Sequence, residues 1–208
     1  FFRKRNHFRF RLCRPRFRAL WDISSLGAPS LITEVSSGVV MIFFNMVILS
    51  LSGNIGVAAY GVVANLALVV LSIFTGISQG IQPLVSRNYG AQDAAAVKKV
   101  YRYAITTALV LAAGVYVVLF LFAPQAVSLF NGENNQQLAA IAEPGIRLYF
   151  IGFLFAGFNV VTAVTFSSVD RPRQSFLLSI LRGFVLIIPL IFLLTALLGM
   201  TGVWLAFP

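Results

Sequence analysis

One carboxylate stands out in this sequence of 208 residues, because Glu34 lies inside a long apolar stretch. Ser37 and Asn45 follow it at spacings that place all three side chains on one face of an α-helix. A carboxylate beside hydroxyl and amide oxygens can exchange a proton or bind a small cation, and such groups inside membrane spans commonly mark ion paths. We therefore predict Glu34, with Ser37 and Asn45, as an ion-coupling site. The alternative is a protonated Glu34 that is hydrogen-bonded between helices.

A second set of polar side chains lies in the other apolar stretches and is predicted to line a cavity. Its members are Asn65, Gln79, Gln82, Asn159, Thr162 and Arg182. Small and polar residues in such positions also stabilise helix packing. For Arg182 we favour a third possibility, in which its long side chain extends to the headgroups.

No motif of an enzyme active site is present. The sequence has no HExxH, GxSxG or Walker-type motif, and its six acidic residues are too scattered for paired-carboxylate catalysis. The single cysteine, Cys13, excludes an internal disulfide and a cysteine-rich metal site. We therefore expect neither an enzyme nor a bound cofactor.

The composition is that of a membrane protein. Hydrophobic residues make up 59% of the chain and charged residues 11%, against roughly 45–50% and about 25% in soluble domains. Eight of the 16 lysines and arginines lie before residue 19. A basic segment beside an apolar stretch meets anionic lipid headgroups. We therefore expect the lipid bilayer as a partner, and no nucleic acid, despite the net charge of +10.

The hydropathy pattern predicts an all-α fold, a polytopic membrane helix bundle with five complete transmembrane helices and the start of a sixth. Each of the five apolar segments reaches the roughly 20 residues that cross a bilayer; they are 26–51, 56–78, 100–122, 146–167 and 175–198. The sixth begins near Val203, and residues 52–55 leave room only for a tight helical hairpin. We divide the chain into a basic cytoplasmic arm, 1–22, and a truncated transmembrane lobe, 23–208.

The charges of the connections predict the orientation of the lobe. The basic arm, the second connection and the fourth connection together carry 13 lysines and arginines, whereas the first and third connections carry none. The third connection, 123–145, instead carries Glu133 and Glu143. Because positively charged loops stay in the cytoplasm, the arm and the second and fourth connections are predicted to be cytoplasmic.

Several strings of the sequence resemble one family of membrane transporters. The string Gly76-Ile77-Ser78-Gln79-Gly80-Ile81-Gln82-Pro83-Leu84 resembles the end of the second helix in each half of multidrug and toxic-compound extrusion (MATE) transporters. The stretch Gly27-Ala28-Pro29-Ser30 with Glu34 is similar to the first helix of their C-terminal half. In the first string we expect Gly80 and Pro83 to end the helix at the cytoplasmic face.

This resemblance implies a twelve-helix antiporter of two lobes, which exports cationic or lipophilic compounds in exchange for inward H⁺ or Na⁺. The chain then corresponds to the C-terminal lobe, the missing N-terminal lobe is its partner, and the multi-pass protein lies in a bacterial plasma membrane. Glu34 matches a position that resembles the family's first-helix carboxylate. The chain departs from the family pattern in three ways: it lacks the first lobe with its acidic residue, a carboxylate in the fourth span, and the final helix.

Two other functions stay open at this point. A related flippase for lipid-linked precursors should show several intramembrane cations facing one groove, and this sequence offers only Arg182 at depth. A non-transport scaffold or enzyme subunit would not need Glu34, so its function should survive substitution of that residue.

The orientation predicts which single cysteines an impermeant maleimide reaches in intact cells, once Cys13 has been replaced. We expect Asn134→Cys to react from outside, and Gln92→Cys to react only after permeabilisation, because basic connections stay in the cytoplasm. The measurement is the labelled fraction before and after permeabilisation. The reverse pattern would overturn the orientation.

Overall fold

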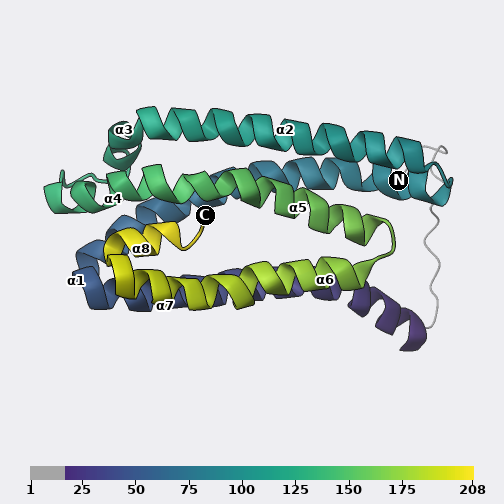
Figure 1. The fold of residues 1–208 in the computed structure, drawn as a ribbon, viewed down its shortest axis with the longest axis horizontal. Coiled ribbons are helices and arrows are strands. Elements are labelled where there is room, and N and C mark those ends of the chain that lie inside the picture. Colours follow the sequence, from purple (N-terminus) through teal and green to yellow (C-terminus); the bar gives the residue numbers. More distant parts are fainter. Residues whose placement is uncertain (1–16) are drawn as a thin grey trace, which may run out of the picture.

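The computed structural model describes residues 17–208, and within that range the chain is helical and contains no strand (Figure 1). The helices are long, apolar and packed side by side, so the prediction of an all-α membrane bundle is confirmed. Cys13 and residues 1–16 of the basic arm lie outside the described residues.

The first helix, α1 (Phe17–Gly90), consists of two arms that meet at Gly53, whose backbone is not helical (φ 62°, ψ −156°). The first arm is 17–52 and the second is 54–90, and they hold the first two predicted spans. The tight hairpin is therefore confirmed. The expectation that Gly80 and Pro83 end the helix is wrong, since the second arm continues to Gly90. Helices of membrane proteins tolerate an internal proline.

Helix α2 (Ala94–Leu121) lies at the edge of the bundle. Asp93 caps its start by accepting a hydrogen bond from the Ala96 amide at 2.9 Å. Its inward face is narrow, a stripe of Ala104, Ala108 and Ala112. The exposed side chains on its other faces are mostly apolar; they include Val110, Val117, Val118 and Leu121. Helix α2 is therefore an outer helix with a surface suited to lipid.

The predicted third connection, 123–145, is more ordered than we expected. It contains α3 (Ala123–Ser128) and most of α4 (Gln136–Tyr149). Asn135 starts α4 by accepting hydrogen bonds from the amides of Gln137 and Leu138. A short 3₁₀ segment, η1 (Phe150–Gly152), joins α4 to α5 (Phe153–Ser168), and this pair bends by 49°. The predicted span 146–167 thus corresponds to the end of α4, η1 and most of α5, with a bend within it.

The fifth predicted span, 175–198, corresponds to three pieces: α6 (Pro172–Ile180), a π-helical segment η2 (Leu181–Leu186) and α7 (Ile187–Leu198). Pro189 has no N–H for the carbonyl of Val185, and the wider π turn lies directly before it. Gly199 (φ 59°, ψ −133°) separates α7 from α8 (Met200–Leu205), the beginning of the sixth predicted span.

Helix α8 is fixed by an aromatic core. Trp204 is 2% exposed and packs near Tyr60 of α1, with ring centroids 6.3 Å apart. Phe207 stacks on Tyr149 at 4.3 Å. Gly145 allows this approach, because a Cβ atom there would lie 2.8 Å from the Trp204 ring. Elements from both ends of the chain thus share one core.

The connections separate into two ends of the bundle. The α1–α2 and α5–α6 connections lie at one end, and the Gly53 turn, α3 and the α7–α8 junction lie at the other (Figure 1). The first end therefore gathers the basic residues of the second and fourth connections: Arg87, Lys98, Lys99, Arg171 and Arg173. This grouping agrees with the predicted orientation, in which that end is cytoplasmic.

The hairpin depends on a backbone conformation that a side chain opposes. We expect Gly53→Ala to destabilise the folded protein by about 1–3 kcal/mol, because an L-residue at this positive φ is strained. Gly38→Ala is the control, since Gly38 is helical and has open space around it. The measurement is the unfolding temperature of the two variants in detergent. Equal temperatures would contradict this account of the turn.

Candidate functional site

Glu34 lies on a surface of the lobe rather than in its core. In the first arm of α1, the core-facing side chains are Phe44, Val47 and Ile48, which are at most 8% exposed. Glu34 and Ser37 are exposed, and Asn45 is half-buried. Among the described residues, no hydrogen bond or ion pair to the Glu34 carboxylate is present. The carboxylate is therefore accessible to something outside this lobe.

The second arm of α1 also presents a polar surface. Asn65, Ser72, Gln79 and Gln82 are all exposed. The Asn65 amide donates to the carbonyl of Gly61 at 2.8 Å, which satisfies part of its hydrogen-bonding capacity within the helix. A Cβ atom at Gly61, Gly76 or Gly80 would meet nothing within 4 Å. Within residues 17–208, this stripe of small and polar residues is therefore not a helix-packing face.

Other exposed helix faces of the lobe are apolar by comparison. Helix α2 exposes Val110, Val117 and Val118, and α7 exposes Phe192, Leu193 and Leu197. Apolar side chains can face lipid tails, whereas polar and charged groups in a span face protein or a water-filled cavity. We name the exposed polar residues of α1 the polar face: Glu34, Ser37, Asn65, Ser72, Gln79 and Gln82. Within the polar face, the Glu34 carboxylate and the Gln79 and Gln82 amides have no hydrogen-bond partner among the described residues, so these groups require water or another protein surface.

The remaining predicted candidates occupy different places. Asn159 is half-buried in α5. The Thr162 hydroxyl donates to the Phe158 carbonyl at 2.7 Å and lies 3.0 Å from the Tyr101 hydroxyl of α2. Arg182 belongs to the π-helical segment, and its side chain lies outside the described part of the chain. Of these three residues, Thr162 is the one whose described side chain contacts another helix through a hydroxyl.

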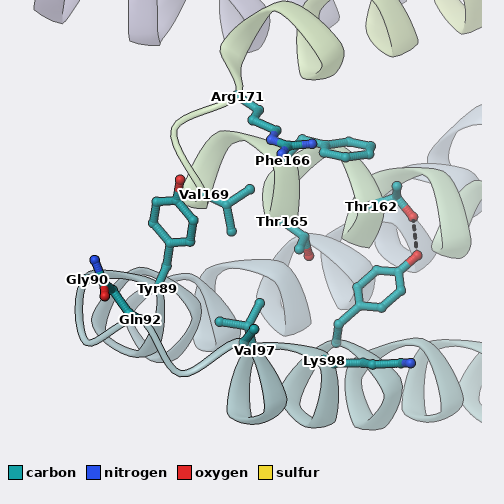
Figure 2. Close-up of a pocket in the computed structure, with 12 residues that line it drawn as sticks. Tyr89, Gly90, Gln92, Val97, Lys98, Thr162, Thr165, Phe166, Val169 and Arg171 are labelled. Atoms are coloured by element: carbon teal, nitrogen blue, oxygen red, sulfur yellow. Dashed lines mark hydrogen bonds between the residues drawn. The ribbon is translucent and has the colours of Figure 1, made fainter.

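A cavity of about 760 Å³ lies at the basic end of the bundle, between α1, α2 and α5 (Figure 2). Its lining consists of Tyr89, Gly90, Gln92, Ala94, Val97, Lys98, Tyr101, Thr162, Thr165, Phe166, Val169 and Arg171. Among the predicted candidates whose side chains are described, only Thr162 lines it. Sequence reasoning missed this pocket, because it used Lys98 and Arg171 only as topological charges. The sequence spacing of Lys98 and Arg171 does not indicate that the second and fourth connections lie close together.

The fold and the polar face together define a class of protein, a polytopic α-helical membrane protein with a polar surface on one of its apolar helices. The MatE family model matches residues 29–193, which is most of the chain. The chain belongs to the MatE family. Because the matching proteins are transporters, the prediction that the chain is not an enzyme is confirmed.

Curated relatives agree with this assignment. The chain is similar to the multidrug export protein MepA of Staphylococcus saprophyticus, with 26% identity over 190 residues that cover 91% of the chain and 41% of the relative. It is also similar to MepA of Staphylococcus haemolyticus, with 27% identity over 201 residues and coverages of 94% and 42%. The chain thus spans about two fifths of the length of these curated relatives.

Solved structures show the same fold. The outward-facing conformation of a multidrug resistance MATE family transporter of the MOP superfamily superposes with a TM-score of 0.86 at 23% identity. This match covers 93% of the chain and 44% of that structure. The inward-facing conformation of a MATE family transporter gives a TM-score of 0.83 at 24% identity, with coverages of 93% and 45%. At these identities the similarity establishes the fold.

If water reaches the polar face, cysteines placed there should react with a water-soluble thiol reagent. We expect Asn65→Cys and Ser72→Cys to be modified faster than Val110→Cys and Val117→Cys, because thiols react as thiolates and ionise poorly in lipid. The measurement is the modification rate in membranes of cells that express the complete gene product without Cys13. Equal rates at all four positions would show that the polar face is not hydrated.

Proposed function

We propose that the complete gene product is a secondary active multidrug efflux antiporter in a bacterial plasma membrane. It exports cationic or lipophilic compounds in exchange for inward H⁺ or Na⁺. The observation that carries this proposal is the polar face of α1, which includes an intramembrane carboxylate and lies outside the core of the lobe. Membership of the MatE family and the similarity to multidrug export proteins support it.

In this proposal the chain is one of two lobes. A second lobe, opposite the polar face, would enclose a central cavity in which exposed groups such as Asn65 and Gln79 meet water and substrate. Transport then proceeds by rocking of one lobe against the other around a binding site at the middle of the membrane. The chain's coverage of about two fifths of its curated relatives is consistent with a single lobe.

Glu34 is the residue that we propose couples the ion gradient to export. If the ion is H⁺, protonation removes the negative charge that holds a cationic substrate, and the substrate leaves to the outside. If the ion is Na⁺, the ionised carboxylate is a hard oxygen ligand, and Ser37 and Asn45 supply further oxygens from the same arm of α1. Under both schemes, one carboxylate binds either the coupling ion or the cationic substrate.

The substitution Glu34→Gln tests this role, since it removes the charge and keeps the shape and polarity of the side chain. We expect gradient-driven efflux of a cationic dye to fall by roughly tenfold or more, because a charge-assisted interaction contributes about 1.5–3 kcal/mol. The measurement is dye efflux from energised cells at equal membrane expression. Glu133→Gln is the matched control, because Glu133 is an exposed carboxylate outside the helices, between α3 and α4.

Two results would contradict the proposed coupling. Undiminished efflux by the Glu34→Gln variant, with the same dependence on pH and Na⁺, would show that Glu34 is a structural residue. An equal loss in the Glu133→Gln variant would show that the effect comes from general charge rather than from the position of Glu34.

A further inference from the structure

The cavity at the basic end lies where the predicted spans meet water. Tyr101 and Phe166 lie just inside the ends of predicted spans, whereas Lys98 and Arg171 lie just outside them. Tyr89 adds a second tyrosine to the lining. Aromatic rings with a polar tip are typical of the headgroup level of a membrane. The cavity therefore straddles the boundary between the headgroups and the hydrocarbon core.

The side chains that line the cavity carry positive charge. Lys98 comes from α2 and Arg171 from the α5–α6 connection, and no acidic side chain is among the lining residues. Two carboxylates lie next to lining residues in the sequence, Asp93 and Asp170. The Asp93 carboxylate already accepts the hydrogen bond that caps α2. The cavity thus offers two cations to an anion.

Its walls are apolar. Figure 2 shows Arg171 and Phe166 on one wall, with Val97 and Lys98 on the opposite wall. The Tyr101 hydroxyl is engaged with the Thr162 hydroxyl at 3.0 Å, so the ring forms part of the lining while its polar tip is satisfied. Because each wall carries one cation and one apolar side chain, a molecule that fills this cavity must carry both an anionic group and apolar groups. A soluble anion without apolar groups would leave apolar side chains of the lining, such as Val97 and Phe166, without an apolar contact.

We propose that the cavity binds an anionic phospholipid. Lys98 and Arg171, one on each wall, attract its anionic headgroup, and the upper part of the acyl chains lies against Val97 and Phe166. The volume of about 760 Å³ falls within the ~300–1,000 Å³ of small-molecule sites. Because α2 is the outer helix with an apolar exposed surface, a lipid reaches the site from the bilayer without crossing the lobe.

The bound lipid would link the start of α2 to the α5–α6 connection, in addition to the hydrogen bond between Tyr101 and Thr162. Helix α2 contributes a narrow alanine stripe to the core, and within the described residues no ion pair joins Lys98 or Arg171 to an acidic side chain. A lipid that contacts both walls of the cavity would tie the start of α2 to the α5–α6 connection. The lipid should therefore stabilise the folded protein as well as bind to it.

Native mass spectrometry of the detergent-solubilised complete gene product tests the proposal, with added phosphatidylglycerol compared with phosphatidylcholine. The test variant is Lys98→Gln with Arg171→Gln. The matched control is Lys99→Gln with Arg173→Gln, which removes the same charge at the same end of the bundle from residues that do not line the cavity. Unfolding temperatures with and without each lipid provide the second measurement.

We expect phosphatidylglycerol to bind the test variant about 30-fold more weakly than the parent, because each basic residue beside an anionic headgroup contributes roughly fivefold in affinity. The control should retain binding within about twofold. Phosphatidylglycerol should raise the unfolding temperature of the parent and the control but not that of the test variant, and phosphatidylcholine should have little effect on all three.

Three results would overturn the proposal. An equal loss of binding in both double variants would mean general attraction to a basic membrane face. Unchanged binding in the test variant would place the lipid elsewhere. Inorganic phosphate that binds the parent as tightly as phosphatidylglycerol, and loses binding in the test variant, would identify a soluble anion as the ligand.

Discussion

The lobe depends on one constraint, that polar groups within a bilayer have no water to bond with. Helices satisfy their own backbone groups, and many polar side chains here follow the same rule. The hydroxyls of Ser72 and Thr75 and the amide of Asn65 each donate to the carbonyl four residues earlier in the helix. The Glu34 carboxylate does not do so, because among the described residues no hydrogen bond joins it to a helix carbonyl or to any other group. Its requirement for a partner outside the lobe follows from this difference.

Glycines and prolines determine where these internally hydrogen-bonded helices turn or change pitch. Gly53 and Gly199 adopt positive φ values, and the turns that they permit need almost no extra residues. The first turn makes two antiparallel arms from one helix, and the second directs α8 back into the aromatic core around Trp204. The π-helical segment before Pro189 and the 3₁₀ segment between α4 and α5 allow the other spans to bend around that core. A few backbone positions therefore determine the shape of a bundle in which most side chains of the spans are apolar.

Hydropathy alone predicted the helical class, the approximate spans and the hairpin, because a bilayer imposes length and polarity directly on the sequence. It could not predict that 123–145 contains helices, since α4 starts with polar residues that Asn135 caps and only later becomes apolar. Periodicity placed Glu34 on a distinct face, but it could not show that Asn65 and Gln79 lie outside the core of the lobe. That distinction depends on which neighbouring helix covers each face, which is a property of tertiary packing.

The basic end shows how the same charge can serve two purposes. Lys98 and Lys99 are neighbours in the sequence and contribute equally to the orientation of the protein, as do Arg171 and Arg173. Orientation depends only on which side of the membrane a charge lies, so it tolerates movement of a lysine by one residue. A cavity tolerates it less, because one residue along a helix turns a side chain by about 100° and only some positions of α2 face the cavity. Lys98 therefore lines the cavity beside Val97, whereas Lys99 lies over the ring of Tyr103 at 5.9 Å. Charges that only orient the lobe can be exchanged among neighbouring positions, and charges that hold a ligand cannot.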